Sequence, residues 1–235
     1  MNRDAPTELL LVRHGESQSS RSGTVGGPLG CRGLTAHGRR QTGRLARRLR
    51  AEHARRPLDA LYAASHLTRV QQSARLVSAA LGLDVVTEPG LREADMGAAD
   101  GRPWREVVAA FGGAPALRPE RPLAPGAESW GAYLRRVRAA LDRLLERHAG
   151  QRVLVVGHGE TVAAVSQILL RLPADVRAHT AFVSHPTGLT HWARRPLPWP
   201  PVPGSALGWA LLCHNDTSHL PADHLPAEPA VSATS

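Results

Sequence analysis

Apolar residues follow two patterns along this chain: short continuous runs, and longer stretches in which they recur every three or four positions. The short runs, bounded by turn residues, predict buried strands at 8–12, 59–63, 84–87, 153–156, 189–193 and 209–214. The helical spacing predicts helices over about 36–54, 65–81, 104–111, 130–148 and 161–170. Because strands and helices alternate, we expect an α/β fold, a three-layer α/β/α sandwich with a mostly parallel sheet.

Three segments interrupt this alternation. Residues 20–33 contain five glycines, which predicts a loop that runs over the surface or borders a pocket. Prolines punctuate residues 91–129, and we expect this insertion to form a small cap over the strand ends. A proline-rich hairpin is expected at 194–208. Residues 1–220 are therefore predicted to form a single domain, and 221–235 have the composition of a disordered tail.

The chain has a formal net charge of +9, and all 29 of its basic residues are arginine. Arginine, alanine, glycine and proline are abundant together, as in proteins encoded by GC-rich DNA, so part of the charge reflects composition. The arginines form no block with interleaved aromatic residues, which argues against a nucleic-acid partner. An acidic small-molecule substrate suits the same charge.

Other features narrow the class of protein further. Cys31 and Cys213 suggest neither a disulfide framework nor a zinc site, and they suit a reducing cytoplasm. The N-terminal apolar run is too short for a signal peptide or a membrane span, so we expect a cytoplasmic protein with no membrane partner. Histidines elsewhere in the chain lack metal-ligand spacing, and no metal is predicted.

Two predicted strands end in a His-Gly dipeptide at the point where a helix begins. These dipeptides are His14-Gly15 and His158-Gly159. Ligands of open parallel sheets bind at the carboxyl ends of the strands, where helix N-termini present N–H groups to anions. We therefore expect both histidines to face one crevice.

Arginines at the same edge favour phosphoryl transfer. Arg13 adjoins His14, and Arg69 lies in the first turn of the helix that follows the second strand. Guanidinium groups bind phosphate oxygens in a bidentate manner. A neutral imidazole can attack phosphorus, which divides the reaction into two displacements and requires no metal.

The segment 11–17, Leu-Val-Arg-His-Gly-Glu-Ser, resembles the N-terminal signature of the histidine phosphatase (phosphoglycerate-mutase-like) superfamily. Further family-like features follow in order: Gly33-Leu34-Thr35 with Gly38 and Gln41, Ser65 with Arg69 and Gln72, Leu91-Arg92-Glu93 with Gly97 and Gly101, and Gly157-His158-Gly159. The resemblance covers about residues 8–170. The later segment 215–220 resembles the closing segment of actinobacterial-type members.

This resemblance implies a role for each matching residue and no cofactor. His14 becomes phosphorylated, and Glu93 protonates the leaving oxygen and later activates water, with Asp95 as the alternative acid. His158 is implied both as a catalytic and as a phosphate-binding residue, and the other phosphate-binding residues implied are Arg13, Gly15 and Arg69.

The outer part of the pocket is less well defined by the sequence. Ser20 and Cys31 stand where many family members have Asn and Asp. The residues expected to contact the rest of the substrate are Ser20, Cys31, Gly33, Trp104 and Thr187, and Trp130 is a further candidate wall.

We expect a metal-independent phosphatase that acts on a small phosphorylated metabolite. A phosphomutase is the first alternative, but the mutases carry a longer Glu-Arg-His-Tyr-Gly region around the acid, whereas residues 91–97 read Leu-Arg-Glu-Ala-Asp-Met-Gly. A non-catalytic protein that binds a phosphorylated ligand is the second alternative. The sequence leaves open the identity of the substrate, the pathway and the oligomeric state, a homodimer included.

Overall fold

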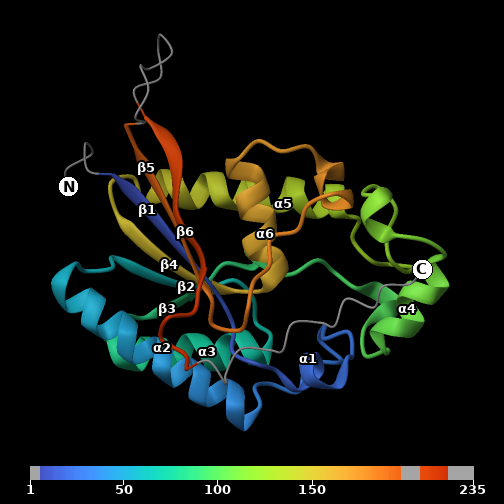
Figure 1. Ribbon diagram of the computed structural model, residues 1–235, viewed down its shortest axis with the longest axis horizontal. Helices are drawn as coiled ribbons and strands as arrows, with labels where there is room; N and C mark the ends of the chain where they lie inside the picture. Colours follow the sequence, from blue (N-terminus) through green and yellow to red (C-terminus); the bar gives the residue numbers. More distant parts are fainter. Residues whose placement is uncertain (1–5, 197–206, 222–235) are drawn as a thin grey trace.

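The computed structural model describes residues 6–196 and 207–221, and it contains the α/β fold expected from the sequence (Figure 1). Its strands form a six-stranded sheet in the order β3-β2-β4-β1-β5-β6. The first four of these strands are parallel, whereas β5 runs antiparallel to β1 and β6 antiparallel to β5. The strand bounds are β1 Thr7–Arg13, β2 Ala60–Ala63, β3 Val85–Thr87, β4 Arg152–Gly157, β5 Leu189–Arg195 and β6 Gly208–Asp216.

Helices cover both faces of the sheet. The α-helices are α1 Gln18–Ser22, α2 Ala36–Arg55, α3 Thr68–Leu81, α4 Trp104–Phe111, α5 Trp130–Arg147 and α6 Gly159–Leu169. Short 3-10 helices lie at Pro89–Leu91, Gly97–Ala99, Pro115–Leu117 and Ala174–Ala178. In Figure 1, α2 and α3 lie on one side of the sheet and α5 and α6 on the other.

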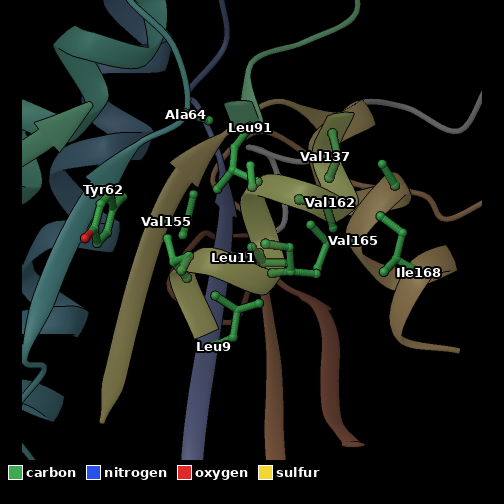
Figure 2. Close-up of a cluster of buried hydrophobic side chains, with 14 of the residues drawn as sticks. Leu9, Leu11, Tyr62, Ala64, Leu91, Val137, Val155, Val162, Val165 and Ile168 are labelled. Carbon is green, nitrogen blue, oxygen red and sulfur yellow. The ribbon is translucent and has the colours of Figure 1, made fainter. Parts of the chain in front are cut away.

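Strand β1 shows how the sequence builds these layers. Successive side chains of a strand point to opposite faces. Leu10 and Val12 therefore join the buried cluster formed with α2 and α3, and Leu9 and Leu11 join the cluster formed with α5 and α6 (Figure 2). A strand that is apolar on both faces must lie inside the sheet, and β1 is paired on both sides, with β4 and β5.

Some element boundaries differ from those expected. The segment expected to be irregular from residue 20 contains the end of α1, which Ser17 caps and Gly23 ends. Helix α3 begins at Thr68 rather than Ser65, because the Ser65 hydroxyl accepts from the Leu67 N–H and pairs with His158 instead of capping the helix.

The insertion at 91–129 contains α4 and two of the 3-10 helices. It has a small apolar cluster of its own, in which Met96, Ala99 and Val107 pack with Val25 from the glycine-rich loop. Most of the proline-rich hairpin and of the C-terminal tail lies outside the described residues.

Candidate active site

The two His-Gly turns lie side by side because β1 and β4 are adjacent and in register. Arg13 pairs with Gly157, and the His14 N–H donates to the Gly157 carbonyl over 2.9 Å. The His14 and His158 ring centroids are 5.5 Å apart with an interplanar angle of 78°. Both side chains are buried, so the structure brings the two imidazoles into one site.

His14 has a defined hydrogen-bonding pattern. Its Nδ1 lies 2.7 Å from the Gly15 carbonyl, which accepts only if Nδ1 carries the proton. Its Nε2 then has the lone pair and accepts from Nε of Arg69 over 3.0 Å. Burial, reinforced by Arg69 and Arg13, holds the pKa of His14 well below its usual range. At neutral pH the ring is therefore uncharged, with a nucleophilic nitrogen at Nε2.

The Arg69 guanidinium connects four groups of the site. Besides His14, it donates to the Gly26 carbonyl, to Oε2 of Glu93 over 2.5 Å and to Nδ1 of His158 over 3.3 Å. The residue is buried, in the first turn of α3 as expected. One side chain thus orients both histidines and the candidate acid.

Arg13 reaches the site from the end of β1. Its Nη1 donates to the Ser184 carbonyl over 2.5 Å, while its buried Nε has no hydrogen-bond partner among the described residues. The Arg13 side chain also lies beside Gly159 at the start of α6. Two guanidinium groups and a helix N-terminus therefore meet at this edge of the sheet, an arrangement that favours an anion.

His158 is the most deeply placed member of the site. Its Nε2 lies 2.9 Å from the Ser65 hydroxyl. Burial is the main reason that the pKa of His158 lies well below its usual range, with Arg69 as the next cause. Because Nδ1 accepts from Arg69, Nε2 carries the proton and donates to Ser65.

Glu93 lies beside both Arg69 and His158. Its Oε2 is 3.5 Å from Nδ1 of His158, and its side chain is 21% exposed. Burial raises the pKa of Glu93, and this effect outweighs the opposing effects of Arg69 and Arg13. Asp95, the alternative acid, is exposed and accepts from the Gly97 N–H, outside the cavity that Glu93 lines.

A cavity of about 290 Å³, which we call the reaction cavity, is bordered by His14, Arg13, Arg69 and Glu93, whereas His158 is not among its lining residues. It is lined by Arg13, His14, Ser19, Ser20, Thr24, Gly26, Arg69, Glu93, Met96, Trp104, Gly159, Glu160, Phe182 and Ser184. Of the residues expected to contact the rest of the substrate, Ser20 and Trp104 are in this set.

Trp130 lines a neighbouring cavity instead, and Cys31, Gly33 and Thr187 line neither of the two. Cys31 is half-buried near Arg69, which contributes to lowering the pKa of its thiol against the effect of burial. Gly33 has a positive φ of 78° and packs against Gln72. Thr187 is fully buried, and its N–H donates to the Arg13 carbonyl.

Gly15 was expected to bind phosphate. Its N–H instead donates to the Ser73 hydroxyl over 3.2 Å, so in this structure the N–H group already has an acceptor.

Glu160 lines the cavity and was not expected from the sequence. Burial and the nearby Glu93 raise the pKa of its carboxyl to about 7. Its side chain lies 3.5 Å from Nη2 of Arg177. The sequence feature that could have indicated Glu160 is its position directly after His158-Gly159, in the first turn of a helix that begins at the strand ends.

The described residues contain neither a cluster of metal ligands nor a membrane-spanning helix. Within residues 6–196 and 207–221, no three or more His, Cys, Asp or Glu side chains group in a way that could hold a metal ion. In the same part of the chain, no helix combines the length and apolarity needed to cross a bilayer.

Comparison with known proteins gives consistent matches over most of the chain. The model of the histidine phosphatase superfamily (branch 1) matches residues 9–196. The probable phosphoglycerate mutase GpmB of Yersinia enterocolitica is 33% identical over 91% of this chain and 94% of the relative. Its Yersinia pestis counterpart is 32% identical over the same shares.

Solved structures share the fold. A mycobacterial glucosyl-3-phosphoglycerate phosphatase superposes with a TM-score of 0.72 at 23% identity, over 89% of this chain and 99% of that one. The phosphoserine phosphatase of Entamoeba histolytica, in complex with 3-phosphoglyceric acid, gives a TM-score of 0.71 at 21% identity, over 91% and 98% of the two chains.

Proposed function

The chain belongs to the histidine phosphatase superfamily (branch 1), and from this premise we propose that it is a phosphomonoester hydrolase that acts through a phosphohistidine on His14. Its substrate is a small phosphorylated metabolite. The observation that carries the proposal is the buried, uncharged His14, whose Nε2 accepts from Arg69 at the wall of the reaction cavity. Arg13, Arg69 and the N-terminus of α6 surround the place that the phosphoryl group occupies.

In the first displacement, the Nε2 lone pair of His14 attacks phosphorus and the bond to the leaving alcohol oxygen breaks. Glu93 gives its proton to that oxygen, and its raised pKa keeps the acid form available. The imidazole becomes positively charged as the new N–P bond forms. The hydrogen bond from Nδ1 to the Gly15 carbonyl stabilises this charge.

In the second displacement, water attacks the phosphohistidine in line with the N–P bond. The Glu93 carboxylate accepts the proton of the water, and His14 leaves as the neutral imidazole it was at the start. One carboxyl group therefore serves both steps, as microscopic reversibility requires. Arg13 and Arg69 hold the phosphoryl oxygens throughout. His158 takes part by accepting from Arg69, which keeps that guanidinium in place.

A phosphomutase is the second candidate, because the two Yersinia relatives carry that name. The same residues would form the phosphoenzyme, and the group would return to the substrate instead of passing to water. The short Leu-Arg-Glu-Ala-Asp-Met-Gly stretch around Glu93 supports the hydrolase. The similar solved proteins named as phosphatases support it as well.

The proposal is tested by offering the protein p-nitrophenyl phosphate and 3-phosphoglycerate, and by trapping the phosphoenzyme in rapid-quench experiments. We expect phosphate release and an acid-labile, alkali-stable phosphoprotein. His14→Ala is expected to lose at least about a thousandfold in turnover while still binding phosphate. Formation of 2-phosphoglycerate without release of phosphate would establish the mutase, and equal turnover by His14→Ala would rule out a phosphohistidine.

The proposal extends to a cytoplasmic location. Cys31 and Cys213 are both free thiols in the structure. A reducing cytoplasm keeps such thiols free.

A further inference from the structure

A second cavity, of about 370 Å³, adjoins the reaction cavity. The two cavities share Met96, Trp104 and Glu160 as lining residues. The second volume is at the lower end of the roughly 300–1,000 Å³ typical of small-molecule sites, and the first is just below that range. A molecule whose phosphate occupies the first cavity can therefore extend past these three residues into the second.

The wall of the second cavity is mainly apolar. It comes from the insertion and from the start of α5, and it includes Val108, Pro115, Pro119, Leu123 and Trp130. The reaction cavity differs in being lined mostly by arginine, histidine, carboxyl and hydroxyl groups. The chemistry of the wall thus changes from polar and charged to mainly apolar across the three residues that the two cavities share.

Several charged side chains around the second cavity already have partners. Arg177 lies over the Trp130 ring at 3.8 Å and beside Glu160 at 3.5 Å. Glu128 is bound by Arg136 over 2.5 Å, and Arg121 lies over the Phe111 ring at 4.1 Å. Asp95 and Arg118 also line the cavity. An uncharged group can pack on the apolar part of the wall and leave the existing ion pairs and cation–π contacts in place.

Two apolar side chains of this wall are exposed to solvent. Trp104 is 38% exposed and Val108 is 43% exposed, although they belong to the same short helix whose Val107 and Phe111 are buried. Covering apolar surface is favourable by about 25 cal/mol per Å². An aromatic ring would gain this burial and could also pack against tryptophan, an interaction of about 0.5–1.5 kcal/mol beyond burial.

We propose that the second cavity binds an uncharged aryl group of the substrate, so that the preferred substrates are phosphomonoesters of aryl-substituted alcohols. The inference rests on the proposed function, which it deepens by naming the substrate class. Phosphate and aryl group are then recognised by separate parts of the protein: the strand ends bind the phosphate, and the insertion with the start of α5 binds the ring.

The test compares two homologous series of phosphomonoesters with primary alcohol leaving groups. One series is ω-phenylalkyl phosphates with one to four methylene groups, and the other is the n-alkyl phosphates of the same chain lengths. We expect at least one phenylalkyl phosphate to have a kcat/KM about tenfold or more above its alkyl counterpart. Equal values throughout the two series would overturn the proposal.

Variants test whether the preference for phenylalkyl phosphates depends on the second cavity. Val108→Asp places a charge on the apolar wall at an exposed position, so the fold should tolerate it, and we expect the phenyl preference to fall below about threefold. Ala116→Asp, at another residue of the same cavity, should do the same. Val86→Asp is the matched control, because Val86 is 48% exposed on the edge strand β3 and lines neither cavity. An undiminished preference in both cavity variants would contradict the assignment.

A binding measurement separates this inference from the proposed function. Calorimetric titration of His14→Ala with 3-phenylpropyl phosphate and with n-propyl phosphate requires no turnover. Tighter binding of the phenyl compound, abolished by adding Val108→Asp, would support the aryl site even if the parent protein hydrolyses neither series. Equal binding of the two compounds would reject it even if both are hydrolysed.

Discussion

At the scale of single residues, His14 lines the reaction cavity together with two guanidinium groups, and the buried ring of His158 lies 5.5 Å from that of His14. Burial lowers the pKa of both rings, and Arg69 lowers it further. The same burial raises the pKa of Glu93. The site therefore favours a deprotonated imidazole and shifts Glu93 toward its acid form in one low-dielectric space, which is the combination that the proposed first displacement requires.

Glu93→Gln tests the role of this acid. We expect kcat for alkyl phosphates to fall by about 10²–10⁴, the usual contribution of general acid-base catalysis. The loss should be much smaller for formation of the phosphoenzyme from p-nitrophenyl phosphate, because p-nitrophenolate leaves readily without a proton. Single-turnover release of the alcohol measures both. An equal loss for the two substrates would assign Glu93 a positioning role through Arg69.

The pH dependence of alcohol release follows from the directions in which the pKa values of Glu93 and His14 are shifted. The pKa of Glu93 is raised above 4.5, so its acid form is lost, and alcohol release slows, as pH rises through that raised pKa. The pKa of His14 is lowered below 6.5, so protonation of the nucleophile limits the rate only at more acidic pH. In Glu93→Gln, the alkaline fall in the single-turnover rate should disappear while the acid limb remains.

At the scale of elements, the end of β1 is fixed by a segment that follows α6. The Thr187 N–H donates to the Arg13 carbonyl over 2.9 Å, and the Ser184 carbonyl accepts from the Arg13 side chain. Thr187 has a positive φ of 63°, a conformation that needs support from its surroundings. Asn215 at the end of β6 provides part of it, because its Oδ1 accepts from the His185 N–H over 2.7 Å.

Asn215→Ala should therefore weaken phosphate binding without changing any residue that lines the cavity. We expect KM and the inhibition constant of orthovanadate to rise by about three- to tenfold, as the loss of one or two buried hydrogen bonds implies. Asp216→Asn is the control, since it breaks the neighbouring ion pair with Arg48 and leaves segment 184–188 in place. If both variants change vanadate inhibition equally, the effect is one of general stability.

Glu8 links three elements at the opposite end of β1. Its buried carboxylate contacts Arg56 after α2, Arg152 on β4 and His191 on β5. These hydrogen bonds outweigh burial and lower the pKa of Glu8 from 4.5 to about 2. A depressed pKa adds stability above pH 4.5 that is lost as pH falls toward 2.

Glu8→Gln should lower the free energy of unfolding near pH 7 by on the order of 3 kcal/mol, because it leaves Arg152 without its buried partner. The difference from the parent should shrink steadily between pH 4.5 and pH 2 in urea titrations. Glu106→Gln is the comparison, since its pair with Arg102 is exposed and should be worth about 0.5 kcal/mol or less. A difference for Glu8→Gln that does not vary with pH would show that charge is not the cause.

At the scale of the whole molecule, the reaction cavity draws on residues from distant parts of the sequence. Arg13, Arg69, Glu93, Gly159 and Ser184 all line it. A ligand that bridges these segments binds only the folded protein, and it therefore stabilises the whole fold in proportion to its occupancy.

Orthovanadate at a hundred times its dissociation constant should stabilise the fold by about 2.7 kcal/mol, which raises the Tm by roughly 5–10 °C for a chain of this size. His14→Ala should retain much of this shift, because the arginines remain. Arg69→Gln should lose most of it, because the side chain that joins both histidines and Glu93 is changed. An identical shift in Arg69→Gln, followed by differential scanning fluorimetry, would place the anion elsewhere.

The sequence by itself determined the class of fold and the core of the site. Apolar runs ending at His14 and His158 required buried strands, and the carboxyl ends of parallel strands meet at one edge. The same local pattern predicted that Arg13 and Arg69 lie at this edge. These features could be predicted because each depends on residues close together in the chain, namely a strand, the turn after it and the helix that follows.

Only the tertiary structure decided which groups face the cavity. Gly15 and Thr187 adjoin the site, but the Gly15 N–H binds Ser73 and the Thr187 N–H binds Arg13. Glu160 faces the cavity, and its pKa of about 7 depends on burial and on Glu93, which is far away in sequence. The apolar cavity beside it depends on how the insertion packs against α5 and α6. Contacts between such distant segments leave no periodic pattern in the sequence, and so they could not be predicted from it.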